Sequence, residues 1–189
     1  MRFGIKSVSM DDIARELGMS KKTLYVHVKD KRELVYLTFK NHIEEDERFC
    51  NEVMDSTSNS IQQLLNLAKH LVDHFKNMNP STMFDVQKYY PSCWKLFTKH
   101  KDEFILGQVR ENITQGIDQG MYRDGVNIDI ISKLYISLIN ASIDPAIFPG
   151  TKYNHIDIFV QLFDYHLHAL MTDQGRAYFE EHKETLFTT

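Results

Sequence analysis

Residues 9–28 read Ser-Met-Asp-Asp-Ile-Ala-Arg-Glu-Leu-Gly-Met-Ser-Lys-Lys-Thr-Leu-Tyr-Val-His-Val, and this stretch carries the signals for two short helices joined by a tight turn. Ser9 is a favourable N-cap for the first helix, and Gly18 supplies the left-handed residue that closes it. Ser20 is the N-cap of the second helix, whose apolar residues recur four apart. Two short helices around a glycine-containing turn predict a helix-turn-helix, in which the second helix enters the major groove of DNA.

The polar residues of the second helix fit contact with DNA. Lys21 and Lys22 lie at its N-terminus, where side-chain charge and helix dipole both favour a phosphate group. Thr23, Tyr25 and His27 are able to donate to phosphate or to reach base edges. An ordinary two-helix hairpin with a solvated face would show similar residues. The spacing therefore favours DNA binding without excluding the hairpin.

The order of residues in this region resembles the DNA-binding segment of TetR-family regulators. The matching blocks are Ile13-Ala14, Gly18-Met19-Ser20, Leu24-Tyr25-Val26-His27-Val28 and Lys31-Arg32-Glu33-Leu34. The resemblance covers about residues 4–40, and it is specific because turn, core and contact residues agree in one register. It departs at Val28, where the family usually has Phe, and a smaller apolar group there affects packing more than recognition.

This resemblance implies a role for each polar position of the motif. Thr23 and Lys22 are candidates for base edges or nearby phosphates, and Lys31 is a further phosphate clamp at the start of the next helix. The full set of expected DNA contacts is Ser9, Ser20, Lys21, Lys22, Thr23, Tyr25, His27 and Lys31.

In the family one more amphipathic helix precedes residues 3–8, and here only residues 1–3 match its end. Either the chain is short, or its start was assigned at an internal Met of a longer protein. We favour the second interpretation because the rest of the motif is intact. Without that helix we expect Ile13, Leu17 and Leu24 to be exposed, at a cost of about 1.5–3 kcal/mol per large side chain. We therefore expect these 189 residues to bind operator DNA weakly or to have a mobile head.

The charge distribution divides the chain into two parts. Residues 1–41 carry nine Lys or Arg and five Asp or Glu, whereas the remainder carries 13 basic and 21 acidic residues. A basic end on an acidic body is typical of a DNA-binding head joined to a solvated regulatory part. We expect a DNA-binding domain over residues 1–41 and a regulatory, dimerising domain over residues 42–189.

Apolar residues recur three and four apart almost throughout, which predicts an all-α fold. The expected helices cover about residues 10–17, 21–28, 31–54, 60–78, a short segment after Pro80, 91–121, 128–143, 155–171 and a tail after Asp173. The longest of them crosses from the basic head into the acidic body, which favours a rigid connection between the two.

The helices expected at 128–143 and 155–171 are apolar on more than one side, so each must bury two faces. A fully buried central helix would show the same pattern. For two adjacent helices near the end of a small chain, we favour a four-helix homodimer interface, which also suits two DNA half-sites. The residues expected in this interface are Ile131, Leu134, Leu138, Phe159, Phe163, Leu167 and Leu170.

By resemblance, the body also holds a cavity for a small-molecule effector. An aromatic and polar region of the sequence coincides with the family's pocket, although most of its residues are expected in the core. Apolar walls with few polar groups would suit a hydrophobic or aromatic ligand. The candidate pocket residues are His70, His74, Phe75, Met78, Phe84, Tyr90, Trp94 and Phe97.

Other functions have little support. His70 and His74 share a helix face, but no third metal ligand can be placed beside them, so no metal and no cofactor are expected. Cys50 and Cys93 are expected as free thiols, and no catalytic elbow or phosphate loop accompanies them, which disfavours an enzyme. No apolar run reaches the length of a membrane span, and a cytoplasmic location is expected. The remaining alternative is a dimeric helical adaptor whose basic head contacts an acidic partner rather than duplex DNA.

Overall fold

The computed structural model describes residues 4–76, 79 and 82–183. Within these residues the chain is helical, and its one pair of bridged extended residues joins Tyr122 to Met171. In chain order the elements are η1 (Ile5–Ser7), α1 (Met10–Glu16), α2 (Lys21–His27), α3 (Lys31–Ser56), α4 (Ser60–Lys76), α5 (Thr82–Tyr89), α6 (Pro91–His100), η2 (Lys101–Ile105), α7 (Leu106–Asp118), α8 (Ile128–Ser142), α9 (His155–Leu170) and α10 (Asp173–His182).

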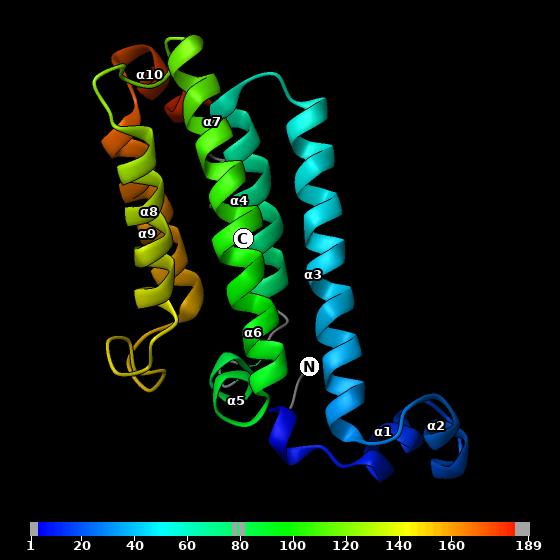
Figure 1. The fold of residues 1–189 in the computed structure, drawn as a ribbon. Helices are drawn as coiled ribbons and strands as arrows, with labels where there is room; N and C mark the ends of the chain where they lie inside the picture. The colour runs from blue at the N-terminus through cyan, green and yellow to red at the C-terminus, as the bar shows by residue number, and fades with distance from the viewer. Residues whose placement is uncertain (1–3, 77–78, 80–81, 184–189) are drawn as a thin grey trace.

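The head and the body are joined by α3, the longest helix (Figure 1). Helices α1 and α2 project sideways from one end of α3, and α10 lies at the opposite end of the molecule. Helices α6 and α7 form one continuous column in front of α4, with η2 as a π-helical turn between them. The predicted all-α fold with a helix-turn-helix head and a helical body is confirmed. In the part of the chain described, no helix is both long and apolar enough to cross a bilayer.

Two separate hydrophobic clusters hold the body. The larger one, the upper cluster, joins α4, α7, α9 and α10 through fully buried side chains such as Ile61, Ile113, Leu167 and Phe179. The smaller one, the lower cluster, contains Ile5, Val35, Val86, Tyr90 and Cys93 and thereby joins η1 and α3 to α5 and α6. Because η1 precedes the head, the lower cluster fixes the head's first segment to the body.

Close packing of α7 on Tyr122 gives a sharp test of the upper cluster. A Cβ atom added at Gly116 would collide with the buried ring of Tyr122, whereas one added at Gly107 in the same helix would meet open space. We expect Gly116→Ala to lower the free energy of unfolding by about 1–3 kcal/mol, the cost of overpacking. The matched control Gly107→Ala should raise it by up to about 1 kcal/mol, since Ala is the better helix former. Urea denaturation measures both, and equal effects would contradict this packing.

Candidate nucleic-acid interface

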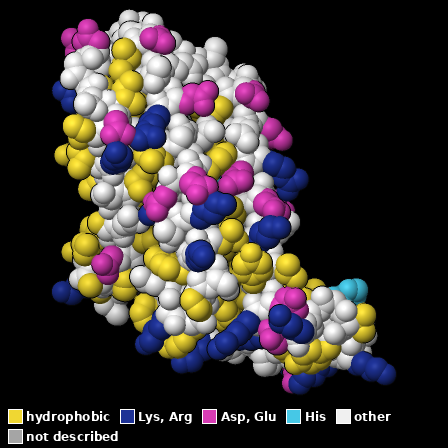
Figure 2. All heavy atoms as spheres, in the orientation of Figure 1, with side chains coloured by type: hydrophobic (Ala, Val, Ile, Leu, Met, Phe, Trp, Pro, Cys, Tyr) yellow, Lys and Arg dark blue, Asp and Glu magenta, His cyan; other side chains and the backbone are white. Residues whose placement is uncertain are grey.

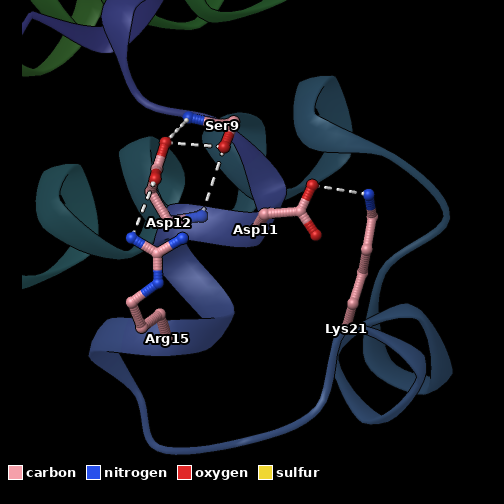
Figure 3. A network of polar contacts seen from close by, with 5 residues as sticks. All are labelled: Ser9, Asp11, Asp12, Arg15 and Lys21. Carbon is pink, nitrogen blue, oxygen red and sulfur yellow. Dashed lines mark hydrogen bonds and ion pairs between the residues drawn. The ribbon is translucent and has the colours of Figure 1, made fainter.

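A reciprocal capping box fixes the start of α1 (Figure 3). The Ser9 backbone N–H donates to Asp12 Oδ2 at 2.9 Å, and the Asp12 backbone N–H donates to Ser9 Oγ at 3.2 Å. The Ser9 hydroxyl also donates to the same carboxylate at 2.6 Å, and these hydrogen bonds hold the pKa of Asp12 below its usual value. Two of the helix's free N-terminal donors are therefore satisfied, and α1 begins at a defined residue.

The turn between α1 and α2 follows the sequence prediction closely. Gly18 has φ of 64°, the left-handed conformation expected of it, and Ser20 Oγ accepts from the Thr23 backbone N–H at 3.0 Å. Behind the turn, Met10 and Ala14 of α1 pack against Leu24 of α2. Leu24 is only 4% exposed because this small cluster covers it, so the expectation that Leu24 would be exposed was wrong. Leu17, by contrast, is 57% exposed.

A cleft of about 430 Å³ lies on the head where η1, α1, α2 and the start of α3 meet. Of the residues expected to contact DNA, Ser9, Lys21, Tyr25 and Lys31 line it. Ser20, Lys22, Thr23 and His27 lie outside the cleft and are exposed. The cleft thus brings several predicted phosphate ligands together, while the rest of α2 remains open for base edges.

The cleft also contains Lys6 and Asp11, which sequence reasoning missed. Lys6 belongs to η1, the short segment before α1. Its Nζ donates to the Tyr89 hydroxyl at 3.4 Å and lies 4.7 Å from the centre of that ring. The Lys31 Nζ donates to the Ile5 carbonyl oxygen at 2.6 Å, and burial lowers the pKa of Lys31.

Asp11 holds the third lysine of the cleft. Lys21 Nζ donates to Asp11 Oδ2 at 2.7 Å, and this hydrogen bond raises the pKa of Lys21 (Figure 3). Three ammonium groups, from Lys6, Lys21 and Lys31, are therefore ordered around one cleft by partners within the chain. Figure 2 shows Lys and Arg side chains gathered along the lower edge of the molecule, where α5 and the head lie. Such a group of cations is suited to bind the phosphate backbone.

The ion pair of Lys21 with Asp11 leads to a testable expectation. A DNA phosphate must compete with the Asp11 carboxylate for Lys21, so removing that carboxylate should favour DNA. We expect Asp11→Asn to bind duplex DNA about threefold to tenfold more tightly at low salt, with a log–log salt slope steeper by about one. Glu16→Gln makes the same charge change at an exposed position outside the cleft and is the control. Fluorescence anisotropy measures both, and an Asp11→Asn variant no tighter than Glu16→Gln would refute the competition.

Comparison with known proteins identifies the head. The family model described as bacterial regulatory proteins, tetR family, matches residues 1–36, which include η1, α1, α2 and the start of α3. The head is therefore similar to that of the TetR family, and the chain as a whole is similar to an HTH-type transcriptional regulator. The chain is a DNA-binding transcriptional regulator of the TetR type, and the resemblance inferred from the helix-turn-helix is confirmed.

Other comparisons match over most of the chain's length. An uncharacterized HTH-type transcriptional regulator, YvaF, from Bacillus subtilis (strain 168) is 25% identical over 143 residues, covering 74% of this chain and 73% of the relative. A regulator from Saccharomonospora viridis, solved in complex with choline, has a TM-score of 0.68 at 17% identity, covering 90% of this chain and 91% of that chain. A TetR transcription regulator from Haloarcula marismortui ATCC 43049 has a TM-score of 0.68 at 16% identity, covering 88% of this chain and 89% of that chain. The two solved structures support the fold.

The candidate pocket residues of the body lie in several different environments. His70 Nε2 lies 3.2 Å from Asp46 Oδ1 on α3, and His74 meets the ring of His42. Tyr90 is buried in the lower cluster. Trp94 packs against that cluster and Phe97 against Trp94, whereas Phe84 is 41% exposed. The Phe75 side chain and Met78 lie outside the described residues.

His70 and His74 do not form part of a metal site in the described structure. Among residues 4–76, 79 and 82–183, no group of three or more His, Cys, Asp or Glu side chains is arranged to hold a metal ion. His70 stacks on Phe49, with ring centroids 3.9 Å apart, and bonds to Asp46. Its described contacts are those of a side chain packed between α3 and α4.

The two apolar helices near the end of the chain divide into a core face and an exposed face. Phe163, Leu167 and Leu170 are at most 4% exposed and belong to the upper cluster. Their expected role in a dimer interface is corrected, because they are buried in one cluster with side chains of α4, α7 and α10 of the same chain. Ile131 and Phe159 pack partly against this cluster. The exposed stripe of α8 consists of Ile130, Leu134 and Leu138, which are 54%, 54% and 38% exposed.

Proposed function

We propose that this TetR-family chain is a ligand-responsive repressor that binds a palindromic operator as a homodimer. The observation that carries the DNA-binding part is the cleft of the head, where Lys6, Lys21 and Lys31 surround the N-terminus of α1. Phosphates bound there would orient α2, whose exposed Lys22 and Thr23 would then read base edges in the major groove. Ser9, Ser20, Tyr25 and His27 would complete the contact.

The exposed stripe of α8 supports the homodimer. Ile130, Leu134 and Leu138 are four residues apart, so they form one continuous apolar row along the helix. On α9, Tyr165 is 68% exposed. A row of large apolar side chains on the surface of a helical body is typical of an interface between subunits. A two-fold dimer would present two heads to two half-sites separated by a whole number of helical turns.

Contacts between α5 and η1 support the response to a ligand. The Lys6 backbone N–H donates to Asp85 Oδ2 at 3.2 Å, and the Lys6 ammonium contacts Tyr89. Asp85 and Tyr89 both belong to α5, so a movement of α5 would displace a lysine of the DNA-binding cleft. The Saccharomonospora viridis regulator, which shares this fold, was solved with choline bound. We infer that a small molecule bound in the body of this chain controls the head through α5.

Selection of binding sites from a random pool of duplex DNA tests this function. We expect the purified chain to enrich one palindrome, and to prefer it over bulk DNA by about a thousandfold or more. Binding should weaken steeply with salt, since phosphate contacts release counterions. If no selected sequence competes better than bulk DNA, the chain is not an operator-binding repressor. The adaptor alternative would then be favoured by salt-dependent binding to an acidic protein.

A further inference from the structure

A single buried cation lies within the body. Lys101, the first residue of η2, is 4% exposed, and it is the one Lys or Arg among the described residues that is buried to this degree. Its Nζ lies 2.7 Å from Oδ1 of Asp102, whose own side chain is 52% exposed. A buried ammonium group is costly unless it is paired, and here its partner is the neighbouring residue at the surface.

The backbone at this position is unusual as well. Residues Lys101–Ile105 form a π-helical turn inside the long column of α6 and α7. The Leu106 N–H bonds back to the Lys101 carbonyl oxygen, as a π-helix requires. Single π turns inside α-helices are rare and occur frequently at functional sites. The turn packs against α8, which stands beside the column in Figure 1.

Two aromatic rings lie on the same face of the helix below this ammonium group. Phe97 and Trp94 precede Lys101 by four and seven residues, so the three side chains share one face where α6 continues into η2. The centres of the Trp94 and Phe97 rings are 5.6 Å apart, and both side chains are half-buried. Ile105, one turn beyond Lys101, packs against the upper cluster, and Trp94 packs against the lower cluster. Lys101 therefore lies at the junction between the two clusters.

We infer that Lys101 binds the anionic group of the effector, and that the effector is an amphiphilic carboxylate whose apolar part lies against Phe97 and Trp94. This inference rests on the proposed ligand response and names its chemical class. The ammonium group of Lys101 is already removed from water in the folded protein, so binding a ligand adds little further desolvation cost. An incoming carboxylate replaces Asp102, whose side chain can turn to water without a burial cost because it is half-exposed.

Trp94 makes the inference directly measurable, because it is the sole tryptophan of the chain. The probes are octanoate and 4-phenylbutyrate, each paired with its alcohol, octanol or 4-phenylbutanol, and with octyltrimethylammonium as a cation. All are titrated into the full chain below their aggregation concentrations while Trp94 fluorescence is followed. We expect at least one carboxylate to give a saturable change and to bind about tenfold or more tightly than its alcohol, as expected for a hydrogen bond to a charged group.

Variants separate the role of Lys101 from general packing. Lys101→Met should lose about tenfold or more in carboxylate affinity and keep its affinity for the alcohol. Lys99→Met is the control, since that side chain is 67% exposed on the same helix, and it should bind as the wild type does. Asp102→Asn keeps an oxygen that can accept from the Lys101 ammonium group but removes the competing negative charge, so it should bind the carboxylate more tightly. This second variant keeps the test decisive if Lys101→Met fails to fold.

Four results would overturn the inference: equal binding of carboxylate and alcohol, preference for the cation, no fluorescence change with any probe, or unchanged or weaker carboxylate binding by Asp102→Asn. Operator selection is measured separately on the same protein. Loss of carboxylate selectivity with operator selection intact would remove this inference alone, whereas failure of operator selection would remove the repressor function itself.

Discussion

Leu134→Glu should convert the protein to a monomer and lower its affinity for the palindromic operator by about a hundredfold or more. Leu134 is the central residue of the exposed stripe of α8 and is 54% exposed. In a two-fold dimer the stripe meets itself, so each interface would contain two unpaired carboxylates in an apolar contact. A monomer binds one half-site only, and loses the gain from linking two heads, which is typically about a hundredfold to ten-thousandfold.

Sedimentation velocity and operator titration on the same samples measure the two effects. Leu37→Glu is the matched control, because Leu37 is an exposed leucine on α3, 45% exposed, outside α8 and α9. That variant should remain a dimer. A dimeric Leu134→Glu protein, or a wild-type chain that is monomeric at micromolar concentration, would contradict an interface on this stripe.

The second large effect concerns pH. His166 on α9 is 7% exposed, and its ring centre lies 4.1 Å from that of Tyr135 on α8. Burial lowers the pKa of His166 to about 4. In the unfolded chain a histidine takes up its proton near pH 6.5, so between pH 6.5 and 4 the unfolded state binds more protons than the folded state. The free energy of unfolding should therefore fall as the pH drops through this window, by up to about 3 kcal/mol.

Urea denaturation at a series of pH values from 7 to 4 isolates this contribution when His166→Gln is compared with the wild type. The variant is expected to be less stable at pH 7 but to lose less stability on acidification. His27→Gln, at an exposed position of α2, should retain the wild-type pH dependence. Parallel curves for wild type and His166→Gln would show that His166 does not carry the acid sensitivity.

The head could be predicted from the sequence because its signals are local. Ser9, Gly18 and Ser20 each act within one turn of their own helix, and the structure uses them as the caps and turn that their residue types favour. Lys6 and Asp11 could not be found in this way. Their place in the cleft depends on how η1, α1 and α2 pack, and the Lys21–Asp11 pair joins residues of different helices.

In the body, by contrast, the sequence does not distinguish buried from exposed apolar residues. Leu134 and Phe163 look alike in sequence, since each lies in a helix that is apolar on more than one side. Tertiary packing distinguishes them: α4, α7 and α10 cover one face of α9 and bury Phe163, while the outer row of α8 with Leu134 has no cover within the described chain. Lys101 was also missed, because an isolated lysine in a helix is normally exposed. It lies in the π turn, which packs against α8, and neither the turn nor this packing has a signal in the sequence.

In the proposed complex with DNA, α2 reads the base sequence while the cleft binds the backbone. Titrating Lys22→Ala and Lys31→Ala against the selected operator and its single-base variants tests it most directly, because both changes remove one lysine charge. We predict that Lys22→Ala loses discrimination at one base position, by about 1–3 kcal/mol, and that Lys31→Ala weakens all duplexes alike with a salt slope lower by about one. If both variants weaken every duplex by the same factor, and neither changes the sequence preference, α2 does not read DNA in the way proposed.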